Sequence, residues 1–411
     1  MQLRKLYKTI ETIASQKFPS NEALLTHALL EIINNGEIKI KGGRLWKFDA
    51  RTGSYVLLRQ VGEMEQIKES YRVKVKEYPI FFELPKLRTV LGNEHDEYLR
   101  KRGISSYSAT GVGEKIQWRG KTLYKYVIAF NAEKLDSEMT ASFNIISSAL
   151  GSALRTRKIE EKAQVLVRDL DKARDIQQSI LPLHELHYHS YDIYGVSVAD
   201  RIVGGDFFDY LKSEDDDERI GIVIGDATSK GLSAAVEALY VSGALRMGFE
   251  YQTKISHLIS RVNKLVNKTF SEDHFVSLFY CELANDKNGL VIFANCGHNN
   301  PIHYCTRDNK CELVETTGQV LGPFPETTFK TENFTMQQGD ILLLYTDGIT
   351  EARNERGEFF GENRLMELVI KYKDKSAKEI TQQLLEDNQV FSAIGEYSDD
   401  KTIVTIKRVG E

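Results

Sequence analysis

The sequence has few cysteines and no long apolar segment. Its four cysteines are Cys281, Cys296, Cys305 and Cys311. No two of them form a C-x-x-C pair, so a zinc ribbon is not expected. None has an arginine six residues later, so the usual cysteine-nucleophile loop for phosphate esters is not expected either. No apolar run approaches the roughly 18 residues that span a membrane, and the basic N-terminus lacks the apolar core of a secretory signal. We therefore expect a cytoplasmic protein with no membrane partner.

Charge is unevenly divided along the chain. The net charge is −5 at pH 7, which argues against a protein that binds nucleic acid. Residues 1–150 carry 24 Lys and Arg against 17 Asp and Glu, a net of +7, so the rest of the chain carries a net of −12. The C-terminal part is therefore the acidic part, and several of its acids stand at the ends of predicted strands.

Length and apolar patterning indicate three regions in the 411 residues. We predict a sensor-type domain over residues 1–150, a linker helix over residues 145–182 and a second globular domain over residues 185–411. Strands flanked by helices in the first region, and many strands with paired helices in the last, predict the α+β class.

The first region alternates helix and strand patterns. An amphipathic helix is predicted around Leu3–Ser15, and Pro19-Ser20 signals the start of a second helix, Asn21–Asn34. Strand-like runs follow at Gly43–Asp49, Ser54–Gln60, Tyr71–Val75, Lys115–Trp118 and Leu123–Asn131.

The second region predicts one continuous helix, Ile145–Ile180, which Pro182 ends. Apolar or small residues recur at alternating steps of four and three, the spacing of a coiled-coil seam. The seam consists of Ile145, Ala149, Ser152, Thr156, Ile159, Ala163, Leu166, Leu170, Ala173, Gln177 and Ile180. Its polar members are typical of a marginal coiled coil, so we predict a parallel homodimer. The alternative is a single helix packed on its own domain.

The third region contains many strand patterns and four helical stretches. The helices are predicted at Gly231–Glu250, Ile255–Phe270, Glu362–Tyr372 and Ser376–Asn388. The strands are predicted at Tyr191–Ala199, Phe207–Lys212, Arg219–Gly225, Phe275–Glu282, Leu290–Asn295, Ile302–Thr306, Ile341–Thr346 and Lys401–Lys407. The acidic run Glu214–Glu218 lies between two of these strands, and we expect a solvated hairpin tip there.

Acidic residues stand at the ends of four of these strands. Asp206 precedes one strand and Asp226 follows the next. Asp347 follows a third, and the pair Asp399-Asp400 precedes the last. Convergent carboxylates repel one another unless a cation lies between them, and hard oxygen ligands favour Mg²⁺ or Mn²⁺. A single Asp-Gly is more often a turn, so spacing alone leaves turns and a metal site as open alternatives.

Five motifs occur in a fixed order along the third region. They are Gly204-Gly-Asp-Phe-Phe-Asp209, Gly225-Asp-Ala-Thr-Ser-Lys-Gly231, Gly297-His-Asn-Asn-Pro301, Leu344-Tyr-Thr-Asp-Gly-Ile-Thr-Glu-Ala352 and Asp399-Asp-Lys-Thr402. In this order they resemble the motifs of the metal-dependent protein phosphatases (PPM family), in the SpoIIE/RsbU-like bacterial branch. The segment Asp169–Pro182 resembles the helix that enters those domains. The resemblance covers about residues 165–408 and implies an α/β/β/α sandwich.

The resemblance also implies two Mn²⁺ or Mg²⁺ ions per active site. Asp226 would bridge both ions. Asp347 and Asp399 would complete one of them, while Asp206 and the backbone carbonyl of Ala227 would complete the other. No side chain beyond these ligands is assigned a catalytic role, because metal-activated water is the implied nucleophile.

Neighbouring positions carry further expectations. Asp400 is the alternative to Asp399 as a ligand. Gly205 and Gly348 would allow the backbone to approach closely.

Three other residues in or near the motifs need an interpretation. Ser229 replaces a glycine that is usual in the second motif and would alter that loop. Arg201 is a candidate for substrate phosphate, although a solvated surface arginine is the more frequent case. We expect His298 to be structural.

The resemblance implies hydrolysis of phosphoserine or phosphothreonine on a regulatory protein, such as a STAS-type anti-anti-sigma factor. Our leading hypothesis is a signal-regulated phosphatase, controlled by its first domain through the dimeric linker helix. The rival is a catalytically weak or dead phosphatase-like dimeric scaffold, against which the retained aspartates argue. A third alternative is a phosphatase that needs no input and uses its first domain only for dimerisation.

The first region resembles a GAF domain by a pattern of positions without a sharp signature. The positions are Asn21–Asn34, Gly43–Asp49, Thr52–Leu57, Gly103–Gly113, Tyr124–Asn131 and the closing helix into Leu154. GAF domains bind small molecules or mediate dimers, but no haem, bilin or cyclic-nucleotide motif is visible, so the ligand is unknown or absent. Trp46 and Trp118 are large enough to line a pocket, and core packing is their expected role.

Overall fold

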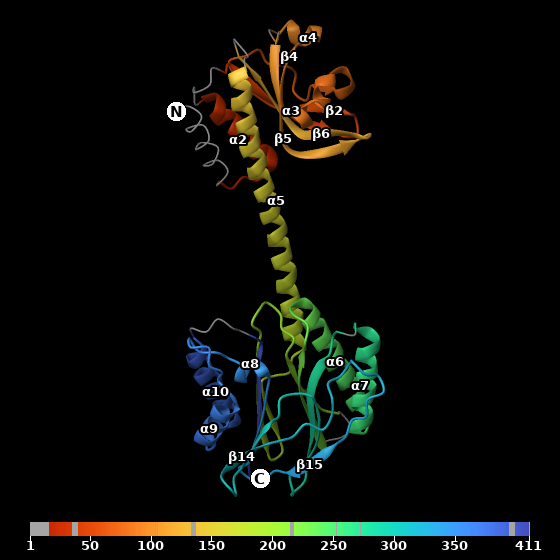
Figure 1. Cartoon of the computed structure of the whole chain (residues 1–411), viewed down its shortest axis with the longest axis vertical. Helices are drawn as coiled ribbons and strands as arrows, with labels where there is room; N and C mark the ends of the chain where they lie inside the picture. The colour runs from red at the N-terminus through yellow and green to blue at the C-terminus, as the bar shows by residue number, and fades with distance from the viewer. Residues whose placement is uncertain are drawn as a thin grey trace. The chain divides into compact units, whose positions relative to one another are not determined.

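The structure is a computed structural model, and it describes residues 16–34, 40–102, 104, 106–132, 137–213, 218–251, 253–271, 273–393 and 399–410. The chain divides into two compact units, Met1–Val165 and Leu166–Glu411 (Figure 1). The helix predicted around Leu3–Ser15 and most of the run Glu214–Glu218 lie outside the described residues. Among the helices in these ranges, none combines the length and the apolar character needed to cross a membrane.

The first unit is built on one antiparallel sheet with the strand order β3-β2-β1-β6-β5-β4. Its strands are β1 (Gly42–Asp49), β2 (Ser54–Gly62), β3 (Arg72–Lys74), β4 (Thr89–Asn93), β5 (Ser106–Trp118) and β6 (Lys121–Asn131). Helix α2 (Asn21–Asn34) and the first turns of α5 (Ser137–Ile180) cover one face. The opposite face carries an aromatic cluster under η1 (Val75–Glu77), η2 (Pro79–Phe82), α3 (Leu84–Leu87) and α4 (Glu97–Arg100).

The second unit is a sandwich of two sheets between two layers of helices (Figure 1). The five-stranded sheet has the order β15-β12-β11-β10-β9 and the six-stranded sheet has the order β14-β13-β16-β17-β8-β7. The strands are β7 (Glu185–Tyr188), β8 (Tyr191–Val198), β9 (Phe207–Leu211), β10 (Arg219–Ala227), β11 (Val276–Ala284), β12 (Leu290–Cys296), β13 (Ile302–Cys305), β14 (Lys310–Leu313), β15 (Glu332–Thr335), β16 (Ile341–Tyr345) and β17 (Lys401–Arg408).

Helices cover the outer face of each sheet in this unit. The five-stranded sheet carries α6 (Leu232–Glu250) and α7 (Ile255–Thr269). The six-stranded sheet carries α8 (Asp347–Thr350), α9 (Glu362–Tyr372) and α10 (Ala377–Ser392). The layers are therefore helix, sheet, sheet and helix, the order that the sequence resemblance implies.

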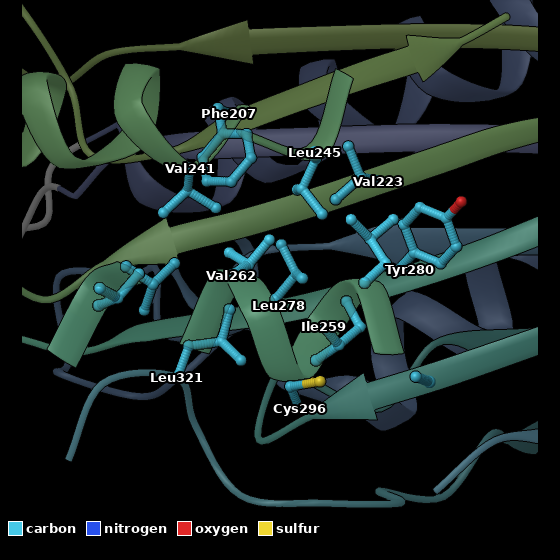
Figure 2. Packing of buried hydrophobic residues seen from close by; sticks show 14 of the residues in the cluster. Phe207, Val223, Val241, Leu245, Ile259, Val262, Leu278, Tyr280, Cys296 and Leu321 are labelled. Atoms are coloured by element: carbon cyan, nitrogen blue, oxygen red, sulfur yellow. The ribbon is translucent and has the colours of Figure 1, made fainter. Parts of the chain in front are cut away.

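Strand β10 is buried on both faces. Ile220, Ile222 and Ile224 alternate into the core between the sheets, while Val223 faces the helices, as the two-residue period of a strand requires. Figure 2 shows Val223 packed near Leu245 of α6 in the helix-facing cluster. A strand fixed on both sides in this way holds the residues at its end in a defined position.

Helix α5 ends at Ile180, as predicted, but begins earlier than Ile145. Phe143 and Ile146 are buried on the sheet of the first unit, so packing extends the helix beyond the predicted seam. Every residue from 158 to 169 is exposed, and the seam residues Ile159 and Leu166 are 68% and 61% exposed.

The predicted helices and strands inside the described ranges are present, but four strands were missed. These are β4, β7, β14 and β15, and each lies at the edge of its sheet. Edge strands are short and half-exposed, so they lack the strong apolar alternation by which a buried strand is recognised.

Candidate metal centre

Two neighbouring strands of the five-stranded sheet bring Asp206 and Asp226 together. Asp206 directly precedes β9, and Asp226 is the second-last residue of β10, which pairs with β9. The Ala227 amide donates to the Gly205 carbonyl at 3.3 Å. A Cβ atom on Gly205 would lie 2.8 Å from the Ala227 carbonyl oxygen, so only glycine permits this approach.

Two neighbouring strands of the six-stranded sheet deliver the other acids. Asp347 follows β16 and begins α8, while Asp399 and Asp400 precede β17, which pairs with β16. A Cβ atom on Gly348 would collide with the Asp400 carbonyl oxygen, so this contact also requires glycine. The structure therefore bears out the expectation of close backbone approach at both glycines.

A hydrogen-bond chain joins the two sheets at Asp206. The carboxylate of Asp206 accepts from the Thr346 hydroxyl at 2.7 Å, and that hydroxyl oxygen accepts from the Thr402 amide at 2.9 Å. Asp206 is only 4% exposed. Thr346 directly precedes Asp347 and Thr402 lies three residues after Asp399, but nothing in the spacing shows that they would form a chain of hydrogen bonds to Asp206.

Asp400 holds the loop before β9. Its two carboxylate oxygens accept from the amides of Asp200 at 2.8 Å and Gly205 at 2.6 Å. Asp399 accepts instead from the amide of Asp400 at 3.0 Å. Both oxygens of Asp400 are thus engaged with the loop, and Asp399 stays the predicted ligand of the pair.

Burial and mutual repulsion disfavour the ionised forms of these acids. Burial and the charges of Asp226 and Asp400 raise the pKa of Asp206 well above its usual value. Burial and the charges of Asp347, Asp399 and Asp400 raise the pKa of Asp226 to about 7, and burial together with Asp399 raises the pKa of Asp347. Each shift has the sign expected for carboxylates that are desolvated and lie close to one another.

The side chains at this site are of the oxygen-donor type that binds a hard divalent cation. Among the described residues, no Lys or Arg side chain forms an ion pair with Asp206, Asp226 or Asp347. Within the same residues, no three acidic, histidine or cysteine side chains are gathered tightly enough to form a complete ligand set. The arrangement is thus a group of mutually repelling carboxylates rather than a closed coordination shell, and divalent cations prefer such oxygen ligands.

The loop after Asp226 is tied to α6 by a buried glutamate. Glu237 is 2% exposed, and its Oε1 atom accepts from the Ser229 hydroxyl at 2.8 Å and contacts His274 Nδ1 at 2.5 Å. Its other oxygen has no partner in the described part of the chain. Ser229, which stands where glycine is usual in the second motif, therefore anchors this loop to α6. No sequence spacing indicated the roles of Glu237 or His274.

The linker helix reaches the loop before β9 through Gln177. This side chain is 7% exposed; its amide donates to the Gly204 carbonyl at 2.8 Å, and its oxygen accepts from the Gly204 amide at 3.3 Å. Gly204 lies two residues before Asp206. The polar character of Gln177 in the seam was the available signal for this contact, but the sequence analysis interpreted it, like Ser152 and Thr156, only as a weak coiled-coil position.

Arg201 and His298 occupy contrasting environments. Arg201 is exposed and lines a small pocket together with Lys230, Asp399 and Asp400, so both its solvated and its phosphate-binding interpretations stay open.

His298 is buried, with Nδ1 at 2.8 Å from the Ser277 hydroxyl, and burial lowers its pKa to about 4. A neutral buried imidazole agrees with the structural role expected for His298.

Comparison with known proteins identifies the second unit. The family description "Stage II sporulation protein E (SpoIIE)" matches residues 216–409. Phosphoserine phosphatase RsbU of Bacillus subtilis is 26% identical over 245 residues, covering 60% of this chain and 71% of RsbU. Protein IcfG of Synechocystis is 30% identical over 227 residues, covering 48% of this chain but 35% of IcfG.

A solved structure supports the same fold. The SiaA-PP2C domain of Pseudomonas aeruginosa superimposes with a TM-score of 0.52 at 18% identity, over 60% of this chain and 98% of that domain. The second unit therefore has the fold of a PP2C-type domain, and residues 216–409 within it match the SpoIIE family of RsbU-like, metal-dependent protein serine/threonine phosphatases.

Proposed function

We propose that the chain is a signal-regulated protein phosphatase that hydrolyses phosphoserine or phosphothreonine on a regulatory protein. The observation that carries this proposal is the group of acids at the ends of paired strands, where burial and mutual repulsion raise the pKa values of Asp206, Asp226 and Asp347. Clustered, buried carboxylates destabilise a fold, so a function that needs them accounts best for their presence.

The acids divide between two cation positions. We assign Asp226 to both, Asp347 and Asp399 to one, and Asp206 with the Ala227 carbonyl to the other. When bound, two Mn²⁺ or Mg²⁺ ions would lower the pKa of a coordinated water and neutralise charge on the phosphoryl oxygens.

The chain's own residues prepare this centre. Thr346 orients the carboxylate of Asp206, and Asp400 fixes the loop that carries Gly205. Arg201 and Lys230 stand exposed at the same pocket and are placed to attract an anionic substrate group.

The substrate class follows by likeness to RsbU, which is named a phosphoserine phosphatase. We propose a phosphorylated regulatory protein, of which a STAS-type anti-anti-sigma factor is the specific candidate. The full chain is expected to release inorganic phosphate from phosphoserine and phosphothreonine peptides with Mn²⁺ and not with EDTA. Equal release in EDTA, or release confined to a phosphotyrosine peptide, would contradict the proposed activity.

We assign the control of phosphatase activity to two parts of the chain. The first unit would act as a GAF-like sensor, and α5 would form a dimeric coiled coil with a second copy. The exposed seam residues Ile159 and Leu166 support the dimer, because apolar side chains at heptad spacing are stabilised by a second helix. The contact of Gln177 with Gly204 supports a path by which a change in helix pairing alters the loop before Asp206.

Replacing Ile159 with lysine is expected to weaken the dimer of the full chain at least about 10-fold, because a charge would enter the apolar seam. Sedimentation equilibrium measures the change, and Glu160→Lys, at the adjacent exposed position outside the seam, is the matched control. A wild-type chain that stays monomeric at tens of micromolar, or an Ile159→Lys variant as dimeric as the control, would argue for a single helix instead.

The alternative function is a catalytically weak or dead dimeric scaffold. The lack of a closed ligand set among the described residues favours it. Tight Mn²⁺ binding without phosphate release from any phosphopeptide would support this alternative over a phosphatase.

A further inference from the structure

Three polar side chains meet beside the loop that follows β10. They belong to Ser229 in the loop, Glu237 on α6 and His274 shortly before β11. Glu237 is 2% exposed, and its Oε2 atom has no hydrogen-bond partner among the described residues. In the same part of the chain no Lys or Arg forms an ion pair with Glu237, and His274 is its one ionisable partner. An acid buried in this way costs stability, and a role at the adjacent site accounts for its presence.

Hydrogen bonds to two different elements hold the loop just before Lys230. The Thr228 amide donates to the Phe275 carbonyl at 3.1 Å, and the Thr228 hydroxyl oxygen accepts from the Phe275 amide at 3.2 Å. The next residue, Ser229, donates from its hydroxyl to Glu237 Oε1 at 2.8 Å. Thr228 is thereby fixed to the segment before β11, and Ser229 is fixed to α6.

Lys230 stands between two fixed residues and lines the pocket at the metal centre. Ser229 precedes it, and Gly231 follows it with a φ of +66°, a conformation that residues with a side chain rarely adopt. Lys230 is exposed and forms no ion pair with an acid of the described residues. Arg201 and Asp399 line the same pocket. Because the backbone is held on both sides, the Lys230 side chain extends from a defined position in the pocket wall.

We propose that the Glu237–His274 pair positions Lys230 to bind the phosphate group of the substrate. This inference rests on the proposed phosphatase function and adds residues that set its affinity for substrate. His274 Nδ1 lies 2.5 Å from Glu237 Oε1 and holds that carboxylate in place, and the carboxylate in turn accepts from Ser229. Because Lys230 attracts the phosphate group both before and during hydrolysis, its contribution appears in KM rather than in kcat.

The test measures kcat and KM of the full chain for a phosphoserine peptide at saturating Mn²⁺. Lys230→Gln is expected to raise KM about 10-fold, the lower end of the range for a lost hydrogen bond to a charged group. Glu237→Leu and Ser229→Ala should each raise KM about 3- to 10-fold and change kcat less than about 2-fold, because they loosen Lys230 without removing it. Ser233→Ala, at an exposed serine in the first turn of α6, is the matched control.

A double variant shows whether the cluster acts through Lys230. In a chain that already carries Lys230→Gln, Ser229→Ala is expected to change KM by less than about 2-fold, because residues that act through one another are not additive. Glu237→Gln keeps an oxygen that can accept from Ser229, so this conservative variant is expected to keep the wild-type KM.

Thermal unfolding separates positioning from a merely structural role. Glu237→Leu replaces a buried acid with an apolar side chain, and His274, whose side chain is 33% exposed, keeps contact with water. We therefore expect an unfolding temperature no lower than that of the wild-type chain. Ser229→Ala covers the case in which Glu237→Leu fails to fold, since it removes the same hydrogen bond from a half-buried loop residue.

Three results would overturn the inference while leaving the phosphatase function intact. The first is an active wild-type chain whose KM is the same as that of Ser229→Ala. The second is a loss of kcat at unchanged KM in Ser229→Ala, and the third is an equal effect of Ser229→Ala with and without Lys230→Gln. A wild-type chain that releases no phosphate at any Mn²⁺ concentration would instead contradict the proposed function, and this inference with it.

Discussion

Replacing Asp226 with asparagine is expected to lower metal-dependent phosphate release by at least about 1,000-fold, the scale of losing a principal electrostatic element of a catalytic site. Asp226 is the acid whose pKa responds to three other carboxylates, Asp347, Asp399 and Asp400, so it lies centrally among them. An amide of nearly the same shape keeps the packing but removes the charge that would hold both cations. Initial rates over a range of Mn²⁺ concentrations measure the loss.

The same substitution is expected to stabilise the metal-free protein at high pH. A carboxyl group whose pKa rises from about 4 in the unfolded chain to about 7 in the folded one favours folding at low pH, and this advantage is lost as pH rises between those values. In EDTA, Asp226→Asn should therefore raise the unfolding free energy at pH 8 by about 2–4 kcal/mol, and change it little at pH 4.

Thermal unfolding in EDTA at pH 4 and pH 8 checks this result. Asp374→Asn is the matched control, because Asp374 is an exposed acid outside the cluster. Equal unfolding temperatures for Asp226→Asn and the wild-type chain at both pH values would show that Asp226 carries no electrostatic strain.

Replacing Gln177 with leucine is expected to raise the Mn²⁺ concentration required for half-maximal activity about 10-fold, with partial recovery at high Mn²⁺. Leucine removes both hydrogen bonds to Gly204, which precedes Gly205 and Asp206 in the loop at the metal centre. A displaced loop weakens cation binding before it affects the chemistry, so the apparent affinity for Mn²⁺ should change more than the saturated rate.

Gln178→Leu is the control, because Gln178 is the adjacent, exposed residue of the same helix. If both variants show the same Mn²⁺ dependence, Gln177 does not couple the linker helix to the loop at the metal centre. A loss of rate at saturating Mn²⁺ with unchanged affinity would place its effect elsewhere than in the loop.

Local patterns in the sequence predicted acids at the strand ends, and the resemblance of the ordered motifs, rather than spacing, made them candidate metal ligands. Asp226 stands near the end of an isoleucine-rich strand buried on both faces, and Asp347 follows a run of apolar residues, so each strand and its candidate ligand are adjacent in the sequence. Gly205 and Gly348 were predicted for the same reason, since a glycine beside such an acid indicates close backbone approach.

Contacts between distant segments could not be predicted in this way. Glu237 meets His274 across 37 residues, and Thr346 meets Asp206 across 140 residues, through side chains that are common in any loop or helix. Such pairs depend on how the sheets and helices pack, which no local period encodes.

The sheet of the first unit shows the same limit. Trp46 was expected to pack in the core, and it does belong to a buried cluster on this sheet. Trp118 packs on Phe48, and its ring nitrogen donates to the Ala50 carbonyl. Arg44 becomes a neighbour of Ala129, and Ala129 a neighbour of Ala109, only through the strand register.

The central claim is that the acids at the strand ends hold two catalytic cations. Equilibrium dialysis of the full chain against Mn²⁺, with phosphate release from a phosphoserine peptide measured on the same samples, tests it most directly. The account predicts two bound Mn²⁺ ions per chain and phosphate release that follows their occupancy. In Asp226→Asn, both Mn²⁺ binding and phosphate release should be lost. A wild-type chain that binds no Mn²⁺, or an Asp226→Asn variant that releases phosphate at the wild-type rate, would contradict it.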